Sequence, residues 1–570
     1  LALACICVDC AKIKREIHVL VIVLLHCTWS ISLEFVIDGS IATMYTIFSQ
    51  RRAGSLRYNP FSYSNASLVR STLRLLSSAD PFLTRNNHLN FVNGECIAGR
   101  GPSLEVLEPA TGRKIVDLRI SDSIDTSSAV QSSRNAYKTW SQLSGTERGR
   151  HLVSLGHAIR RQREDIAHLE VRDTGKVISE ALVDIDSSAD CLEYYGGLVA
   201  GLAGQHFQLP GGNFAYTRRE PLGVVGAIGA WNFPFQTCSW KIAPALAAGN
   251  TVVYKPSPLA PLSAHYLARL ACEVGCPAGV LNVIQGDAST GTELVSHHDV
   301  AKVSFTGSCP TGAAIMEKCA PQIKPVTLEL GGKSPLIIFE DADLANAVNG
   351  ALLANYLTQG EVCSNGARVY VHESLKDDFL SVCKDRVEKM KLGDPLQPET
   401  NMGAVISAAH ADKVMGFIQR AVQDGAHVVC GGGRFHPSEV HLQGGHYIHP
   451  TILDNVNDDM EIVREEVFGP VMCVIPFTDE SEVVELANRT PYGLAAGVYT
   501  KDIQRGHRVV AQLQAGTCFL NTYNMYPVEI PFGGYKRSGI GRENGPDALL
   551  QFTQVKSVFV EMGDTPSPGF

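Results

Sequence analysis

The pattern of hydrophobic and polar positions divides the chain into regions of different character. Between residues 126 and 170, apolar residues recur at helical spacing, as in ERGRHLVSLGHAIRRQREDIAHLEV, and this predicts amphipathic helices. From 220 to 340, short apolar runs end in Gly or Pro, and helical stretches lie between several of them. This order predicts a parallel α/β sheet with active groups at the carboxyl ends of its strands. The runs are GVVGAIGA (223–230), NTVVYKP (250–256), GVLNVIQG (279–286), AKVSFTG (301–307) and KPVTLELGG (324–332).

Three further regions complete the predicted organisation. A second α/β pattern follows over residues 331–530. Residues 206–219, HFQLPGGNFAYTRR, resemble two short strands around a Pro-Gly-Gly turn, which predicts a hairpin. The stretch FTQVKSVFVEM (552–562) predicts one more strand near the end of the chain.

The first part of the chain is interpreted separately. Residues 1–84 are taken as an N-terminal extension, either a targeting segment or an artefact of the gene model. Residues 17–33 are apolar enough to resemble a signal anchor, although three polar residues interrupt them. Residues 44–78 contain five arginines, many serines and no acid, a composition typical of a mitochondrial transit peptide. The alternative is an ordinary basic tail. We therefore expect a cytosolic protein, or a mitochondrial one if residues 44–78 act as a transit peptide.

Composition and charge narrow the class of protein. With 570 residues, 45% hydrophobic and 19% charged, the chain is long enough for about two or three globular domains. The net charge is −9, and Lys and Arg are not clustered, so no nucleic-acid surface is expected. The 16 cysteines are scattered singly, which argues against a disulfide scaffold and favours a reducing compartment. Neither Cys7 and Cys10 nor Cys272 and Cys276 have a second pair of ligands at zinc spacing, so no metal site is expected.

One cysteine lies where little apolar surface can pack around it. Residues 358–368, TQGEVCSNGAR, place Cys363 among small and polar residues, with Gly360 and Gly366 close on either side. Because cysteine is usually a buried small hydrophobe, this setting favours a nucleophile on an exposed loop. The simpler interpretation is a turn that contains a cysteine, and the loop alone does not decide between the two.

Two other polar residues follow predicted strands. Glu329 lies in TLELGG (327–332) between two leucines, where partial desolvation raises a carboxyl pKa and suits it to act as a base. Asn232, in AWNFPFQ (230–236), can donate an amide hydrogen to a developing oxyanion. Taken singly, an exposed Glu on an edge strand and an Asn in a Pro-containing turn are the commoner cases.

Several motifs offer contacts for a nucleotide. Lys255, in YKPSP, lies at a strand end where its ammonium can reach ribose hydroxyls, and a surface lysine is the alternative. Residues 305–312, FTGSCPTG, predict a junction from strand to helix whose backbone N–H groups can hold a pyrophosphate, although so short a turn is a weak signal. In EEVFGP, Glu466 offers a carboxylate for ribose hydroxyls and Phe468 offers a flat ring for packing.

Together and in this order, these motifs resemble the NAD(P)-dependent aldehyde dehydrogenase superfamily over residues 90–562. The resemblance is carried by AWNFPF, KPSP, FTGS, LELGGKSP, the cysteine loop, EEVFGP and PFGGYKRSGIGRENG (531–545). Within the family, LELGGKSPLIIF, GRENG and QLPGG…YTRREPLGV are most similar to the 4-trimethylaminobutyraldehyde and betaine aldehyde dehydrogenases. The resemblance implies an α/β fold with a Rossmann-type cofactor domain, an α/β catalytic domain and a β oligomerisation arm. It divides the chain into an NAD-binding domain (85–200 and 220–330), a catalytic domain (331–530) and the arm (201–219 and 545–562).

The resemblance also assigns roles to individual residues. Cys363 matches the nucleophile, Glu329 the general base, and Asn232 the oxyanion donor that works with the backbone N–H of Cys363. The implied reaction oxidises an aldehyde to an acid through a cysteine thioester, which water activated by Glu329 then hydrolyses. The positions that match cofactor contacts are Lys255, Gly307, Ser308, Cys309, Pro310, Thr311, Glu466, Phe468 and Trp231.

Two positions depart from the family pattern. Glu361 stands where the family often has Gln, and a carboxylate pointing at the thiol would disfavour its ionisation, so we expect it to point away. Pro258 stands where many NAD-preferring relatives have an acid for the ribose 2′-hydroxyl. NAD is therefore expected from the subfamily likeness, and NADP is not excluded by charge.

Substrate and assembly are predicted from the same resemblance. A quaternary ammonium aldehyde would favour an aromatic cage of Phe233, Trp240, Tyr523 and Tyr526, although these rings have an alternative role in packing the channel or core. Because an exposed hairpin cannot satisfy its own edges, we expect a homodimer or homotetramer. The alternative functions are a broad-specificity aliphatic aldehyde dehydrogenase, an acylating enzyme that passes the thioester to coenzyme A, and an inactive member that acts as a binding protein. Glu329 argues against the acylating enzyme, and the intact set of Cys363, Glu329 and Asn232 argues against the inactive one.

Overall fold

A computed structural model describes residues 20–26, 30–37, 40–48, 89–565 and 567–569. The chain forms two units, Leu1–Asp80 and Pro81–Phe570. In the first unit, three strands pair antiparallel in the order β1 (Leu20–His26), β2 (Ser30–Ile37) and β3 (Ser40–Phe48). The described part of the apolar stretch at 17–33 is therefore strand. Within the described residues, no helix is both long and apolar enough to cross a membrane. Of the predicted transit peptide, only residues 44–48 are described, in β3.

The second unit begins with short strands and four long helices. The helices confirm the amphipathic pattern predicted from the sequence, and capping boxes start two of them, with Asp122 and Ser144 as the caps. Gly175 ends the third helix in the left-handed conformation that favours glycine. The elements are β6 (Ser103–Leu107), β7 (Lys114–Arg119), α3 (Ser123–Trp140), α4 (Gly145–Arg161), α5 (Arg163–Thr174) and α6 (Ile178–Leu198).

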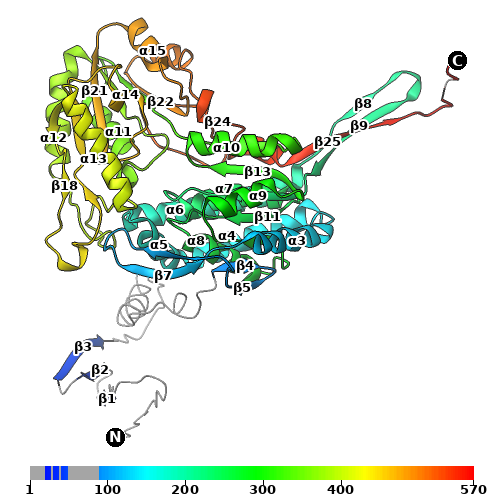
Figure 1. Cartoon of the computed structure of the whole chain (residues 1–570), viewed down its shortest axis with the longest axis horizontal. Coiled ribbons are helices and arrows are strands. Elements are labelled where there is room, and N and C mark those ends of the chain that lie inside the picture. The colour runs from blue at the N-terminus through cyan, green and yellow to red at the C-terminus, as the bar shows by residue number, and fades with distance from the viewer. Residues whose placement is uncertain (1–19, 27–29, 38–39, 49–88, 566, 570) are drawn as a thin grey trace, which may run out of the picture. The chain divides into compact units, whose positions relative to one another are not determined.

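An eight-stranded sheet forms the first layer of this unit, in the order β24-β14-β13-β10-β11-β12-β4-β5. Its five central strands are parallel, as predicted from the apolar runs, and helices connect them (Figure 1). The strands are β4 (Asn90–Val92), β5 (Glu95–Ile97), β10 (Val224–Ile228), β11 (Thr251–Lys255), β12 (Leu281–Val283), β13 (Val300–Thr306), β14 (Val326–Glu329) and β24 (Gly539–Ile540). The connecting helices are α7 (Pro234–Ala247), α8 (Leu262–Glu273), α9 (Ala288–Ser296) and α10 (Cys309–Cys319).

A second sheet of seven strands follows in the order β17-β20-β21-β16-β15-β22-β23. Successive residues of β15 point to opposite faces, since Ile337 packs in one apolar cluster and Leu336 and Ile338 in another. Its strands are β15 (Pro335–Ile338), β16 (Arg368–His372), β17 (His427–Cys430), β20 (Thr451–Asp454), β21 (Val471–Phe477), β22 (Ala495–Tyr499) and β23 (Thr517–Leu520). The helices around it are α11 (Leu344–Tyr356), α12 (Lys376–Val387), α13 (Ala408–Gln423), α14 (Glu461–Arg464), α15 (Glu480–Asn488) and α16 (Ile503–Val510).

A three-stranded antiparallel sheet contains the predicted hairpin and the predicted tail strand. Its order is β25 (Thr553–Val560), β9 (Phe214–Pro221) and β8 (His206–Gln208), and β25 follows α17 (Gly545–Gln551). Figure 1 shows β25, near the C-terminus, lying beside β9. Phe207 and Phe559 on this sheet are 46% and 76% exposed, so much of its apolar surface is uncovered in the single chain.

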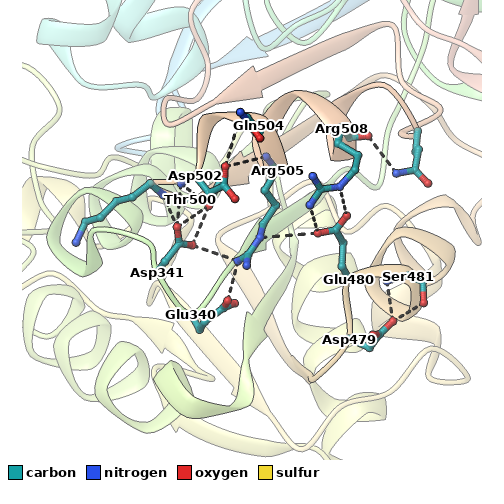
Figure 2. A network of polar contacts seen from close by, with 12 residues as sticks. Glu340, Asp341, Asp479, Glu480, Ser481, Thr500, Asp502, Gln504, Arg505 and Arg508 are labelled. Atoms are coloured by element: carbon teal, nitrogen blue, oxygen red, sulfur yellow. Dashed lines mark hydrogen bonds and ion pairs between the residues drawn. The ribbon is translucent and has the colours of Figure 1, made fainter.

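A network of charged side chains joins the loop after β15 to α15 and α16 (Figure 2). The carboxylate of Asp341 accepts hydrogen bonds from the Thr500 hydroxyl (2.8 Å), from the backbone N–H groups of Lys501 and Asp502 (2.9 Å each) and from Arg505 (3.3 Å). Arg508 binds the Glu480 carboxylate with two hydrogen bonds of 2.8 Å. This network fixes the start of α16 against the second sheet.

Candidate active site

The three residues predicted to carry the chemistry come from different elements. Asn232 follows β10 and precedes α7, and Glu329 is the last residue of β14, so both stand at carboxyl ends of parallel strands in the first sheet. Cys363 lies in the loop between α11 and β16 of the second sheet. The three candidate residues are therefore contributed by both sheets.

The loop that carries Cys363 has an unusual backbone. Thr358 and Gln359 have φ angles of 48° and 54°, in the left-handed region that non-glycine residues rarely adopt. Thr358 is held there by Glu180, which accepts hydrogen bonds from its N–H (3.0 Å) and its hydroxyl (3.2 Å). Gly360 (φ 72°) has no room for a side chain, because a Cβ atom would lie 2.3 Å from the carbonyl carbon of Gly469. The surrounding structure thus holds a strained turn directly before the cysteine.

The Cys363 thiol is in an environment that keeps it protonated. Burial raises its pKa, and the nearby charges of Glu466 and Glu329 raise it further. The backbone N–H groups of Cys363 and Ser364 act in the opposite direction. Glu329, on the first sheet, is therefore close enough for its charge to affect Cys363, in a loop of the second sheet.

The Asn232 side chain is buried and points to the cysteine loop. Its Nδ2 donates a hydrogen bond of 2.7 Å to the carbonyl oxygen of Glu361, two residues before Cys363. The side chain of Glu361 turns elsewhere, as expected, because its Oε1 accepts a hydrogen bond from the backbone N–H of Ile406 (3.0 Å). The Asn232 amide is thus bound to the backbone of the loop that carries Cys363.

The carboxyl group of Glu329 is buried and unpaired. Within residues 89–565, neither of its oxygens has a hydrogen-bond partner. Burial raises its pKa well above the ordinary value, the charge of Glu543 raises it further, and Lys241 and Arg542 oppose the shift. Lys241, on α7, forms an ion pair with Glu543 and lies 3.3 Å from the hydroxyl of Ser304. A reactive carboxyl group therefore faces a buried ion pair.

The candidate cofactor residues gather at the start of α10 and near β11. Ser308 caps α10, and its hydroxyl accepts from the N–H of Thr311 (3.4 Å), while Cys309 and Pro310 form the first turn. The N–H of Gly307 donates to the carbonyl oxygen of Glu329 (3.0 Å), which joins this helix start to the candidate base. Lys255 is buried and donates to the carbonyl oxygens of Pro256 and Gly286, and burial lowers its pKa to about 8.

Three rings that include the candidate cofactor residues Trp231 and Phe468 pack against one another. The rings of Trp231 and Phe468 meet edge to face with centroids 5.1 Å apart, and His410 packs on Trp231 at 5.3 Å. Glu466 accepts a hydrogen bond from the N–H of Gly332 (3.1 Å), and burial raises its pKa to about 7. Glu466 is also close enough to Cys363 for its charge to raise the pKa of that thiol.

Comparison with known proteins gives the family. Residues 97–558 match the sequence profile of the Aldehyde dehydrogenase family. The chain belongs to this aldehyde dehydrogenase family. It is 56% identical to 4-trimethylaminobutyraldehyde dehydrogenase of Homo sapiens over 463 residues, 81% of this chain and 94% of that protein. It is 54% identical to the protein of that name from Oryzias latipes over 484 residues, 85% of this chain and 96% of that protein.

Solved structures agree with the fold of this aldehyde dehydrogenase. The NAD+ complex of an aldehyde dehydrogenase from Bacillus cereus is 41% identical, covers 85% of this chain and 99% of that chain, and has a TM-score of 0.82. A betaine aldehyde dehydrogenase from Staphylococcus aureus in complex with NAD+ is 37% identical, covers 86% of this chain and 98% of that chain, and has a TM-score of 0.83. The α/β fold expected from the sequence is thus confirmed.

The four aromatic residues predicted to form a substrate cage lie in different surroundings. Trp240 packs edge to face on Phe532 with centroids 5.7 Å apart, and Tyr526 packs on the same ring at 5.1 Å. Cys363 and Tyr526 both contact the apolar cluster that contains Trp240 and Phe532. Phe233 is different, because the Lys176 ammonium lies 4.1 Å from its ring centroid.

Tyr523 lies in the core of the second sheet. Its side chain is 1% exposed, its hydroxyl donates to the carbonyl oxygen of Ser364 (2.9 Å), and its ring packs on Phe519.

Three residues of this site were not predicted from the sequence. Phe532 and Glu543 both lie in the quoted segment PFGGYKRSGIGRENG, where the glycines marked the motif but no individual side chain stood out. Lys241 carried a clearer signal, because it is a lone charge in SWKIAPALA, an otherwise mostly apolar helix. A buried lysine on such a helix requires a carboxylate partner, and Glu543 supplies it.

Proposed function

We propose that this aldehyde dehydrogenase oxidises 4-trimethylaminobutyraldehyde, or a closely related aminoaldehyde, to the carboxylic acid with NAD and through a thioester on Cys363. The observation that carries the proposal is the unpaired carboxyl group of Glu329, which is buried and acts electrostatically on Cys363. An interior carboxyl group without partners costs free energy, so its presence beside a thiol favours a role in proton transfer.

In the proposed mechanism, the Cys363 thiol gives its proton to Glu329, which later releases it to solvent. The sulfur adds to the aldehyde carbon, and the carbonyl π electrons move to oxygen. One N–H of Asn232 binds the carbonyl oxygen of Glu361, and the second N–H is assigned to this oxyanion. The bound dinucleotide supplies the two-electron oxidation that converts the adduct into a thioester. Glu329 then removes a proton from water, the new C–O bond forms at the thioester carbon, and the C–S bond breaks to release the Cys363 thiolate.

The residues near α10 fit a dinucleotide. Thr306, at the end of β13, has a buried hydroxyl without a hydrogen-bond partner in the described part of the chain, so a polar group of the ligand can satisfy it. The N-terminus of α10 suits a phosphate. We assign Lys255 and Glu466 to ribose hydroxyls, and Trp231 and Phe468 to the flat nicotinamide ring. NAD as the cofactor is supported by the NAD+ named in the structures of the two similar enzymes.

The aromatic residues support a cationic substrate. We assign the cage to Trp240, Tyr526 and Phe532, because aromatic ring faces attract a quaternary ammonium group. Trp240 and Tyr526 each pack edge to face on Phe532, and Cys363 contacts the apolar cluster that contains Trp240 and Phe532. Phe233 and Tyr523 are left out of the cage. The ammonium of Lys176 already lies over the Phe233 ring, and Tyr523 is buried in the second sheet. The printed names of the similar enzymes agree with this class of substrate.

The decisive experiment compares two aldehydes of equal shape. The full-length protein with NAD is given 4-trimethylaminobutyraldehyde or 5,5-dimethylhexanal, in which carbon replaces the charged nitrogen, and NADH formation is followed. We expect a kcat/KM at least about tenfold higher for the cation, because a desolvated cation–π contact contributes about 2 kcal/mol. Equal values, or a higher kcat/KM for 5,5-dimethylhexanal, would instead support the broad-specificity aliphatic enzyme.

Two variants separate the chemistry from the substrate choice. Cys363→Ser should abolish turnover of every aldehyde while NAD still binds, and retained turnover would remove Cys363 from the mechanism. Trp240→Ala should reduce kcat/KM for the cation more than for 5,5-dimethylhexanal, and equal losses would contradict the cage. Tyr523→Phe is the matched control, since it removes only a hydroxyl in the core and should not change the preference.

We also propose that the chain forms a homodimer or homotetramer through the sheet of β8, β9 and β25. The exposed Phe207 and Phe559 on this sheet support an interface, because a single chain leaves them in water. Light scattering should give two or four times the chain mass, and Phe559→Lys should lower it. Ile503→Lys, at a 56% exposed position on α16, is the control and should leave it unchanged. A monomeric parent protein would contradict the proposal.

For the compartment, we propose the cytosol, with mitochondria as the alternative if residues 44–78 are removed as a transit peptide. The arginine-rich, acid-free composition of that segment supports the alternative. Peptide mapping of the mature N-terminus decides between them. Peptides from residues 44–78 in the mature protein would support the cytosolic form, and a mature start just after this segment would support the mitochondrial one.

A further inference from the structure

Glu361 forms hydrogen bonds to two different segments of the chain, one through its backbone and one through its side chain. Its main-chain carbonyl oxygen accepts the Asn232 amide at 2.7 Å, and its side-chain Oε1 accepts the N–H of Ile406 at 3.0 Å. The side chain is only 1% exposed. One residue therefore binds the oxyanion donor with its backbone and a separate segment with its side chain.

The segment around Ile406 is itself firmly placed. A Cβ atom on Gly403 would lie 1.9 Å from the carbonyl oxygen of Gly175, so the two backbones touch. The carbonyl oxygen of Ala404 accepts a hydrogen bond from Gln359 (3.1 Å), in the strained turn before Cys363. Because the Glu361 side chain is hydrogen-bonded to this segment, both the side chain and the backbone carbonyl group of Glu361 have little freedom to move.

The groups around Glu361 offset the effect of its burial only in part, because its pKa stays well above the ordinary value. Burial raises the pKa of Glu361, the N–H of Ile406 lowers it, and the ammonium of Lys176 opposes the shift as well. Lys176 is fully buried, forms an ion pair with Asp184 at 2.5 Å and covers the ring of Phe233, the residue after Asn232. On the other side, His410 Nε2 lies 3.6 Å from Glu361 and donates to the carbonyl oxygen of Phe468 (2.6 Å).

We propose that Glu361 is a positioning residue: its side-chain hydrogen bond to Ile406 fixes the direction of its own carbonyl oxygen and thereby orients the Asn232 amide toward the reacting oxygen. The inference rests on the proposed function in one respect, the role of Asn232 as oxyanion donor. Since Oε1 accepts from a neutral backbone N–H, the acceptor oxygen at this position, rather than the charge, is what the geometry requires.

A double-mutant cycle on the full-length protein tests the inference. Wild type, Glu361→Ala, Asn232→Ala and the double variant are compared by kcat with NAD and 4-trimethylaminobutyraldehyde. Loss of one oxyanion donor costs on the order of a hundredfold. We expect Glu361→Ala to lower kcat about tenfold or more in the wild-type background, and less than about twofold when Asn232 is already Ala. Glu361→Gln should restore kcat to within about threefold of wild type.

Several results would overturn the inference. Equal fold losses from Glu361→Ala in both backgrounds would mean that it does not act through Asn232. A Glu361→Gln protein as slow as Glu361→Ala would mean that charge is required instead of the acceptor oxygen. Unchanged kcat in Asn232→Ala would remove the oxyanion role itself, and that failure of the proposed function is visible separately from the other two.

A merely structural role is distinguished by two further measurements. The dissociation constant for NAD, from calorimetry, and the thermal unfolding midpoint should change little in Glu361→Gln. If Glu361→Ala does not fold, Glu361→Asp takes its place in the cycle, because the shorter side chain keeps the charge but falls short of the N–H of Ile406. We then expect the same dependence on Asn232, and its absence would contradict the inference.

Discussion

Two charged clusters of this protein differ in how completely their groups are paired. At the surface of the second sheet, Asp341 accepts four hydrogen bonds, and Arg508 holds Glu480 with two (Figure 2). In the interior, Lys241 and Glu543 are paired, but within the described structure neither oxygen of Glu329 has a partner. The surface cluster is satisfied, and the interior cluster is not.

The difference separates stability from reactivity. Hydrogen bonds from Arg508 lower the pKa of Glu480. Partial burial raises the pKa of Asp341, but hydrogen bonds from the Thr500 hydroxyl and from backbone N–H groups outweigh this effect, so the pKa of Asp341 is also lowered. Both remain charged at neutral pH and only hold segments together. Burial instead raises the pKa of Glu329 well above its usual range, so that it exchanges protons closer to neutral pH. The unpaired carboxyl group of Glu329 is thus the one suited to the proposed proton transfer.

The largest effect is expected for Glu329→Gln, which removes the base from the interior cluster but keeps its shape. General bases contribute about 10²- to 10⁴-fold, so kcat should fall by that order. Because only the ionised carboxyl takes a proton and burial raises its pKa, wild-type kcat should rise with pH above the ordinary Glu range. That rise should be absent in Glu329→Gln.

The measurement is steady-state NADH formation from pH 5 to 9 together with a rapid-quench assay for the thioester. The variant should form one equivalent of NADH quickly and then stall as the thioester. A variant with a normal steady state and an unchanged pH profile would show that Glu329 is not the base.

A smaller effect is expected in the pH dependence of stability. Burial raises the pKa of the fully buried Glu170 to about 7 from 4.5. The folded state then binds more protons than the unfolded state between these values, so the contribution of Glu170 to stability is present below pH 4.5 and is lost as pH rises through 7. The free energy of unfolding should fall by on the order of 1–3 kcal/mol between pH 5 and pH 8.

Urea unfolding at these two pH values measures the change, and Glu170→Gln is the control. Gln carries no titrating group, so the free energy of unfolding of the variant should decrease less between pH 5 and pH 8 than that of the wild type. The surface carboxylates act in the opposite direction, because their lowered pKa values make them lose their contribution only as pH falls into the acid range. A protein that is more stable at pH 8 than at pH 5 would contradict the account of Glu170.

In the surface cluster, Asp341→Ala should reduce stability without changing catalysis. The substitution leaves the hydroxyl of Thr500 and the N–H groups of Lys501 and Asp502 without their common acceptor, a loss of about 1–2 kcal/mol. Urea unfolding measures it, and Asp341→Asn, which keeps one oxygen acceptor, should lose less. A lower kcat with unchanged stability would mean that the network communicates with the active site.

The smallest effect is expected for Arg508→Ala in the same network. Its partner Glu480 also lies 3.8 Å from Arg505, so one cation remains after the substitution, and exposed ion pairs contribute little in water. The unfolding midpoint should not shift measurably in 150 mM salt, and Arg508→Lys should behave in the same way. A clear loss would mean that the two arginines act as a cooperative unit.

Much of the fold and the central chemistry could be predicted from the sequence, and the reasons are local. The five predicted apolar runs correspond to β10 to β14. They could be predicted because the length of a strand and the turn residues that end it depend on only a few adjacent residues. Cys363, Glu329 and Asn232 stood out because each is a polar residue in a distinctive local context. The cage stays a prediction, and the structure adds Phe532 as a neighbour of Trp240 and places Tyr523 in the core of the second sheet.

By itself, the sequence determined which elements form, in what order, and which residues carry reactive groups, since these follow from periodicity, turn chemistry and local motifs. Only the tertiary structure decided which of those groups are satisfied. Lys241 meets Glu543 across 302 positions, and Asn232 meets the carbonyl oxygen of Glu361 across 129. Burial and pairing depend on how segments far apart in the chain come together, and a local sequence pattern does not contain that information. The physical reason is desolvation: a carboxyl group becomes a partner or a base according to what surrounds it, and its surroundings come from elsewhere in the chain.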